Sequence, residues 1–189
     1  MADIRSPFPA TMPTSVLNPL RSPFTMHPAA LPPATLAKQC DEVRTRRSGP
    51  GGQHRNKVET AVVLVHRPTG IAAEASERRS QSENRRMALR RLRLRLATEH
   101  RTPAGPQPSE CWRSRTRGRQ LLISVGHDDY PALLAEAFDQ LQAVGWQMAP
   151  AAQVLGINTS QLIGLLRKAP AAWAKIHTLR ATTGLAPLK

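Results

Sequence analysis

The sequence predicts an α+β fold: a short β-sheet packed by one long helix, followed by a small all-α bundle. Two β-branched or apolar runs at 60–66 and 71–75 flank a turn, which indicates neighbouring strands. Leucines then recur at helical spacing over 82–100, and from about residue 130 the spacing is helical almost throughout. With 40% hydrophobic but only 4% aromatic residues, the core is expected to be small and built from Leu, Val, Ile and Ala.

The charge of the chain indicates a polyanionic partner. The formal net charge is +14 over 189 residues, and residues 38–119 hold 20 Lys and Arg against 8 acids. No stretch approaches the roughly 18 to 20 apolar residues of a membrane span, so no membrane partner is expected. Cys40 and Cys111 lie too far apart in sequence for a metal-type pair, which argues against a zinc module or a secreted disulfide scaffold and favours the cytoplasm.

The first part of the chain divides into a leader and an α+β domain. Residues 1–33 contain eight prolines and no apolar period, so they are predicted to be a disordered leader. A basic, acid-poor start is also a feature of organelle transit peptides, which leaves a mitochondrial location as the alternative, although the prolines oppose an amphipathic helix. The domain at 34–100 is expected to contain a short helix at 33–39, strands at 41–46, 60–66 and 71–75, and an irregular loop at 48–53.

A long helix is predicted from an N-cap at Ser82 to about His100. Leu89, Leu92 and Leu96 share one face of this helix and form its core side. A row of arginines lines another face and can be either a solvated surface or an RNA-phosphate face; it consists of Arg86, Arg90 and Arg93.

Residues 101–127 are predicted to be a basic linker rich in Pro, Gly and Arg. Such a segment can lie along phosphates and release counterions, or it can serve only as a flexible spacer. Its arginines, Arg113, Arg115, Arg117 and Arg119, are candidates for RNA binding.

The segment 128–189 is predicted to be a nearly neutral helical domain with helices at 131–146, 151–155, 159–168 and 171–180. Ala152, Gly156 and Leu162 have the spacing of a helix-turn-helix unit. Its second helix would begin near Thr159, but it is very apolar, and only Arg167 and Lys168 could reach phosphate. A nucleic-acid reader and a structural or protein–protein bundle therefore both stay open.

Four spaced motifs between 48 and 84 carry the chemistry. In order they are Ser48-Gly49-x-Gly51-Gly52-Gln53-His54-x-Asn56-Lys57, Ala61-Val62, His66-x-Pro68-Thr69-Gly70-Ile71 and Arg79-Ser80-Gln81-x-x-Asn84. Over residues 36–98 this series resembles the catalytic domain of class I peptide chain release factors. The resemblance implies hydrolysis of the ester between peptide and tRNA by Gly51, Gly52 and Gln53, with the tRNA ribose hydroxyl assisting proton transfer, without a cofactor or metal. The resemblance also implies that the remaining matched residues orient the loop or bind ribosomal RNA. Arg55, Lys57 and Arg79 are the candidates for RNA contact, and Lys57 could serve either role.

Physical chemistry supports these roles. Adjacent glycines allow a backbone to approach a ligand closely, which would aim the Gln53 N–H at the reacting ester. A fixed N–H donor stabilises the oxyanion of the transition state. The neutral Gln53 side chain can shape a pocket that admits water. His54 and His66 are weaker alternatives as general bases, since His54 adjoins the motif and His66 ends a strand.

Departures from the release-factor pattern indicate a short, codon-independent type. Only about 40 proline-rich residues precede the motif, so no stop-codon-reading domain is expected. The tripeptide Ser-Pro-Phe at 6–8 and 22–24 copies one used for stop-codon reading in part of the family, but here it is interpreted as coincidence. The expected function is ribosome rescue by a monomer, with the large ribosomal subunit, rRNA and peptidyl-tRNA as partners. The alternatives are a codon-dependent release factor and a nucleic-acid-binding regulator that acts through 150–168.

Overall fold

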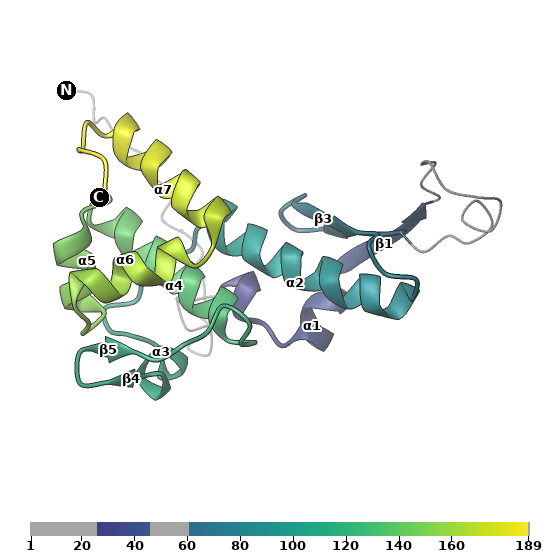
Figure 1. Ribbon diagram of the computed structural model, residues 1–189, viewed down its shortest axis with the longest axis horizontal. Coiled ribbons are helices and arrows are strands. Elements are labelled where there is room, and N and C mark those ends of the chain that lie inside the picture. Colours follow the sequence, from purple (N-terminus) through teal and green to yellow (C-terminus); the bar gives the residue numbers. More distant parts are fainter. Residues whose placement is uncertain (1–25, 46–60, 189) are drawn as a thin grey trace, which may run out of the picture.

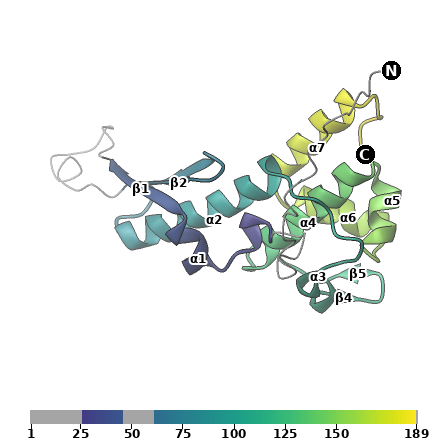
Figure 2. The same cartoon turned by 180° about the vertical axis from the view of Figure 1, so that it is seen from behind.

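The computed structural model describes residues 26–45 and 61–188, in which a small sheet and a group of helices lie at opposite ends of one long helix (Figure 1). That helix, α2 (Gln81–Glu99), is about 28 Å long at 1.5 Å per residue. It packs against strands β2 and β3 and also against helix α4 (Figure 2). Among the described residues, no helix combines the length and the apolar character needed to cross a membrane.

The sheet consists of three antiparallel strands in the order β1-β2-β3. They are β1 (Cys40–Thr45), β2 (Ala61–His66) and β3 (Ala72–Ala75), so all three predicted strands are confirmed to within one residue at each end. Val62, Leu64 and His66 alternate onto the buried face of β2, as the period of two requires. Gly70, with φ of +69°, closes the predicted turn between β2 and β3, a conformation that glycine adopts without strain.

Helix α2 ends where the sequence predicts, but its N-cap lies two residues earlier than predicted. Its N-cap is Ser80, whose hydroxyl accepts a hydrogen bond from the Glu83 N–H, so the expectation of Ser82 is wrong. Ser82 lies inside the helix, with its hydroxyl 2.8 Å from that of Ser80. The predicted apolar face is confirmed, because Leu89, Leu92 and Leu96 are all buried.

The end of the predicted leader is ordered, so the boundary at residue 33 is too late. Residues 28–30 form the 3-10 helix η1 (Pro28–Ala30), and α1 (Pro33–Lys38) follows, as expected for 33–39. Ala29 is fully buried against α2, and its carbonyl accepts a hydrogen bond from Arg93 Nε at 3.1 Å. His27 donates from Nε2 to the His100 carbonyl at 3.2 Å, while its Nδ1 accepts from the Ala29 N–H. These long-range contacts hold a segment that has no apolar period of its own.

Much of the predicted linker is folded. It contains α3 (Glu110–Ser114) and a short hairpin of β4 (Thr116–Arg117) and β5 (Gln120–Leu121). Trp112 is fully buried, and its indole N–H donates to the Leu155 carbonyl at 2.9 Å. Upstream, Thr102 donates from its hydroxyl and its N–H to the buried carboxylate of Asp139. The expectation of an unpacked segment fails because single residues within it find partners on distant helices.

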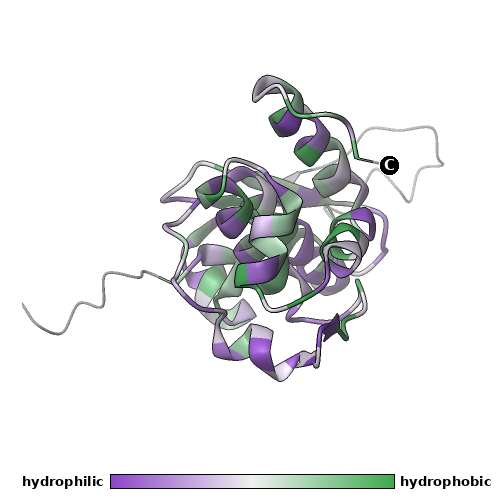
Figure 3. Cartoon of the chain, turned by 90° about the vertical axis from the view of Figure 1, so that its left-hand side faces the viewer, coloured by the Kyte–Doolittle hydropathy of each residue, from purple (hydrophilic) through white to green (hydrophobic). Residues whose placement is uncertain are grey.

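Four helices complete the chain: α4 (Tyr130–Ala143), α5 (Met148–Val154), α6 (Thr159–Arg167) and α7 (Pro170–Thr182). Figure 3 faces this end of the molecule and shows hydrophobic and hydrophilic stretches alternating along the helices. The predicted tight corner is confirmed, with Gly156 at φ +68° between α5 and α6 and with Ala152 and Leu162 buried. The buried residues of these helices and of the sheet form one continuous core.

Candidate functional site

The predicted catalytic residues belong to the segment that joins β1 to β2. Thr45 and Ala61 are paired neighbours in the sheet, so residues 46–60 leave and re-enter it at the same end. Gly51, Gly52, Gln53, Arg55 and Lys57 lie in this segment, outside the described residues, as do His54 and Asn56. The described structure therefore defines the frame that carries the motif.

The start of α2 lies at the same end of the sheet. Ala75, the last residue of β3, pairs with Val62, and only residues 76–80 separate it from α2. Asn84 is fully buried and clamps this connection, because its Oδ1 accepts from the Arg78 N–H and its Nδ2 donates to the Arg78 carbonyl, each at 2.9 Å. The role of Asn84 is thus to hold the backbone of 78–80 beside the sheet end from which 46–60 departs.

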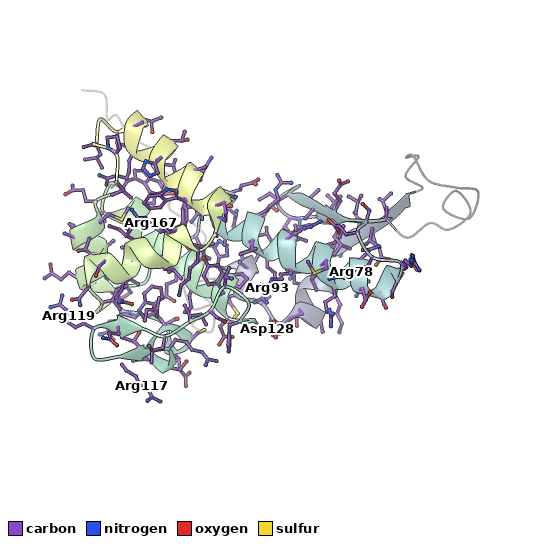
Figure 4. The ribbon with its side chains drawn as sticks, viewed as in Figure 1. Arg78, Arg93, Arg117, Arg119, Asp128 and Arg167 are labelled. Carbon is purple, nitrogen blue, oxygen red and sulfur yellow. The ribbon has the colours of Figure 1, made fainter. Side chains whose placement is uncertain are left out.

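Exposed arginines gather around this clamp. Arg78, labelled in Figure 4, and Arg79 precede the helix, and Arg86 lies on its second turn. Within the described ranges, no hydrogen bond or ion pair engages the side chains of these three arginines. By contrast, Arg85 contacts Glu42 at 2.7 Å and Arg91 contacts Glu77 at 2.6 Å, so those two arginines tie α2 to the sheet side. Arg78, Arg79 and Arg86 keep their charge available to a polyanion. Sequence reasoning missed Arg78, although it directly precedes Arg79.

The predicted row of Arg86, Arg90 and Arg93 does not form one surface. Arg93 is only 7% exposed, burial lowers its pKa, and its Nε bonds to the Ala29 carbonyl, so the assignment of Arg93 to RNA binding is wrong. Arg90 is exposed, but its Nη2 donates to the Val125 carbonyl at 2.7 Å. The row is divided because η1 packs against α2 on one side and the segment before α4 lies on another.

His66 lies at the opposite end of β2 from Ala61, the residue that follows the motif segment. It ends β2 as predicted, five residues from Ala61, which puts it about 16 Å from the sheet end that carries 46–60. It is 1% exposed, and both ring nitrogens are engaged, Nδ1 with the Thr69 hydroxyl at 2.8 Å and Nε2 with Gln39 Oε1 at 3.1 Å. Burial lowers its pKa, and with both ring nitrogens engaged His66 has a structural role at the far end of the strand.

The four arginines of 113–119 lie on α3 and the β4–β5 hairpin. Arg115 pairs with Asp129 at 2.7 Å and holds the hairpin toward the start of α4. Arg113, Arg117 and Arg119 are exposed, and Figure 4 places Arg117 and Arg119 at the outer edge of the molecule. The basic segment is thus a fixed surface at the end of the molecule opposite the sheet.

Comparison with known proteins shows what this part of the chain is similar to. The RF-1 domain family matches residues 37–123, which extends from α1 through the β4–β5 hairpin. A mitochondrial peptide chain release factor 1-like protein of Mus musculus is 51% identical over 55 residues, 29% of this chain and 15% of that protein. Peptide chain release factor 1 of Acidiphilium cryptum is 51% identical over 59 residues, 31% of this chain and 17% of that protein. Peptide chain release factor 2 of Variovorax paradoxus is 53% identical over 58 residues, 29% of this chain and 16% of that protein.

These similarities are confined to one region. The match spans less than a fifth of the length of each of these relatives, which are bacterial or mitochondrial proteins. The RF-1 domain match includes the sheet, α2 and the segment that holds Gly51, Gly52 and Gln53. Residues 37–123 of this chain therefore match the RF-1 domain family, and the relatives that share part of this region are peptide chain release factors.

Proposed function

We propose that this protein is a stop-codon-independent ribosome-rescue factor, which hydrolyses the ester bond of peptidyl-tRNA in the peptidyl-transferase centre of stalled ribosomes. The observation that carries the proposal is the Gly51-Gly52-Gln53 tripeptide within the segment matched by the RF-1 domain. In the proposed reaction, water attacks the ester carbonyl carbon and the bond to the ribose oxygen breaks. The peptide leaves as a carboxylate, and the tRNA regains its hydroxyl.

The residues of the motif have separate roles in this reaction. Gly51 and Gly52 allow the backbone to approach the ester, and the Gln53 N–H stabilises the negative charge that develops on the carbonyl oxygen. The Gln53 side chain shapes the pocket for the attacking water. No cofactor or metal takes part, since the ribose hydroxyl of the tRNA assists proton transfer.

The described frame is suited to this task. The β1–β2 pair holds both ends of the segment 46–60, and the Asn84 clamp fixes the adjacent connection. Arg78, Arg79 and Arg86 add positive charge at the same end, where rRNA and tRNA phosphates would surround the motif. These arginines are proposed RNA contacts, together with Arg55 and Lys57 of the motif segment.

Codon independence is the finer part of the proposal. Each described helix contributes a buried residue to the one continuous core. We therefore expect the helices after α2 to act together with the motif-bearing part rather than as a separate codon-reading unit. The names of the relatives, peptide chain release factors 1 and 2, favour codon-dependent release as the competing function.

The test is a peptide-release assay on three kinds of ribosome: stalled on truncated mRNA, with a stop codon in the decoding site, and with a sense codon there. We expect release from ribosomes on truncated mRNA without any requirement for a stop codon. Release that depends on a stop codon would instead establish the competing function.

Two substitutions at Gln53 separate the roles of its backbone and its side chain. Gln53→Pro removes the N–H and is expected to lower the release rate roughly 10²- to 10³-fold, the effect of losing one oxyanion donor. Gln53→Ala keeps the N–H and is expected to lose less. Leu122→Ala, an exposed position directly after the β4–β5 hairpin, serves as the control. Undiminished release by Gln53→Pro with intact ribosome binding would refute the mechanism.

A further inference from the structure

We propose that the β4–β5 hairpin and helix α6 together form a binding surface for the phosphate backbone of double-stranded RNA. This hairpin–α6 surface consists of Arg117 and Arg119 at the hairpin turn and Lys168 at the end of α6. It lies in the helical end of the molecule, away from the sheet that carries the motif segment (Figure 1).

The hairpin and the residues that follow it are hydrogen-bonded to both ends of α6. The Asn158 N–H donates to the Arg119 carbonyl at 3.2 Å, and the Leu121 N–H donates to Gln161 Oε1 at 3.3 Å. At the other end of α6, Lys168 Nζ donates to the Ile123 carbonyl. The chain from Arg119 to Ile123 therefore runs beside α6, and the basic side chains are mounted on a rigid pair of elements.

The buried Trp112 fixes this pair to the core. Its indole N–H reaches the Leu155 carbonyl at the end of α5, directly before the corner that leads into α6. Arg115 pairs with Asp129 behind the hairpin. Because the surface is ordered before it meets a ligand, binding would not have to offset the conformational entropy of a flexible linker.

The charge on this surface is of one sign. Residues 140–189 contain no Asp or Glu, and neither do residues 116–121 of the hairpin. The acids closest in sequence to the hairpin are Glu110 and Asp128, both exposed and outside residues 116–121, and the acid closest in sequence to α6 is the buried Asp139. The surface thus has no carboxylates of its own to repel phosphate.

The side chains of α6 favour recognition of a backbone over reading of bases. Base reading needs long polar side chains that reach into a groove, typically Arg, Asn or Gln. Here Gln161 is occupied by the hairpin, Arg167 stacks on Trp173 at 4.9 Å, and the outward positions Ser160 and Gly164 are short. Binding is therefore expected to be independent of sequence and strongly dependent on salt.

The dimensions also fit a duplex. Helix α6 has nine residues, so the Arg119 backbone at its start and the Lys168 backbone at its end are separated by roughly the helix length of about 13 Å. A separation of this order allows contacts with phosphates on both sides of a shallow RNA groove. The choice of RNA over DNA rests on the proposed function, in which the partner is the ribosome.

The test measures binding of the full chain to a labelled RNA duplex of mixed sequence by fluorescence anisotropy over a range of KCl concentrations. The double variant Arg117→Gln/Arg119→Gln is expected to bind roughly tenfold more weakly, and the slope of log K against log salt should fall by about two. The matched control, Lys38→Gln/Lys175→Gln, removes the same charge from exposed positions on α1 and α7 and should bind more tightly than the hairpin variant.

Several outcomes would overturn the proposal. Equal affinities of the hairpin variant and the control for the RNA duplex would show that the hairpin–α6 surface does not bind RNA. A DNA duplex bound as tightly as RNA would refute the choice of RNA, and displacement of the RNA by poly-glutamate at equal charge would point to an acidic protein partner. Since no hydrolysis is measured, failure here leaves the proposed function standing. Conversely, a Gln53 variant that loses peptide release should keep its affinity for the duplex.

Discussion

Replacing Trp112 with alanine is expected to lower the free energy of unfolding by about 4 kcal/mol. Trp112 is fully buried, so the substitution removes a whole indole from the core and leaves a cavity between α3 and α5. It also leaves the Leu155 carbonyl without the donor that now lies 2.9 Å away. A buried acceptor that loses its partner costs about 1–3 kcal/mol by itself, and this loss is part of the total.

The size of this loss in stability shows whether residues 101–127 are an unpacked linker or a packed part of the fold. If this segment were an unpacked linker, any substitution in it would change stability by no more than about 0.5 kcal/mol. In the folded arrangement the loss is several times larger, and it lowers the melting temperature by roughly 10 °C for a chain of this size. Leu122→Ala is the matched control, because Leu122 follows the same hairpin and is 51% exposed.

The assay is urea and thermal unfolding followed by far-UV circular dichroism. We expect Trp112→Ala to shift both transitions and Leu122→Ala to leave them nearly unchanged. A loss below about 1 kcal/mol for Trp112→Ala would refute the packed arrangement of the segment and, with it, the rigid mounting of the hairpin.

Two further predictions concern buried polar groups. Burial lowers the pKa of both His27 and His66, so at acidic pH the unfolded chain binds protons that the folded chain does not. The free energy of unfolding should therefore fall as the pH drops below about 6.5, by up to about 1.4 kcal/mol per pH unit for each histidine. Urea titrations at several pH values measure this fall. His66→Gln should reduce this slope, and an unchanged slope would contradict the assignment. Asp139→Ala leaves the half-buried guanidinium of Arg101 without its carboxylate, and it should lower the free energy of unfolding in chemical denaturation by about 3–5 kcal/mol. The exposed control Asp128→Ala should lower it by less than about 0.5 kcal/mol. Equal effects of the two substitutions would contradict a structural role for the Arg101–Asp139 pair.

Where the sequence predicted well, the signal was local. The alternation of 61–66, the turn that ends at Gly70 and the leucine spacing of 89–96 each depend on a few neighbouring residues, and the corresponding elements match the structure closely. The corner at Gly156 is of the same kind, because a positive φ is required within a short turn.

Where prediction failed, the cause was a contact far along the chain. Ala29 was assigned to the leader, yet its carbonyl accepts a hydrogen bond from Arg93 of α2, 64 residues along the chain. Trp112 was assigned to a linker, yet its partner is Leu155. Proline-rich and arginine-rich composition describes what a segment cannot do by itself, and it carries no information on a single residue that another element can bury.

The candidate site shows the same division. The Gly-Gly-Gln tripeptide, its order relative to the motifs after it, and the concentration of positive charge in 38–119 are properties of the sequence alone. Only the tertiary structure decided which arginines face solvent: Arg79 and Arg86 do, whereas Arg93 is buried and Arg115 is paired. The physical reason is that a motif is set by covalent order, while the exposure and the partners of a charged side chain are set by the elements that pack around it.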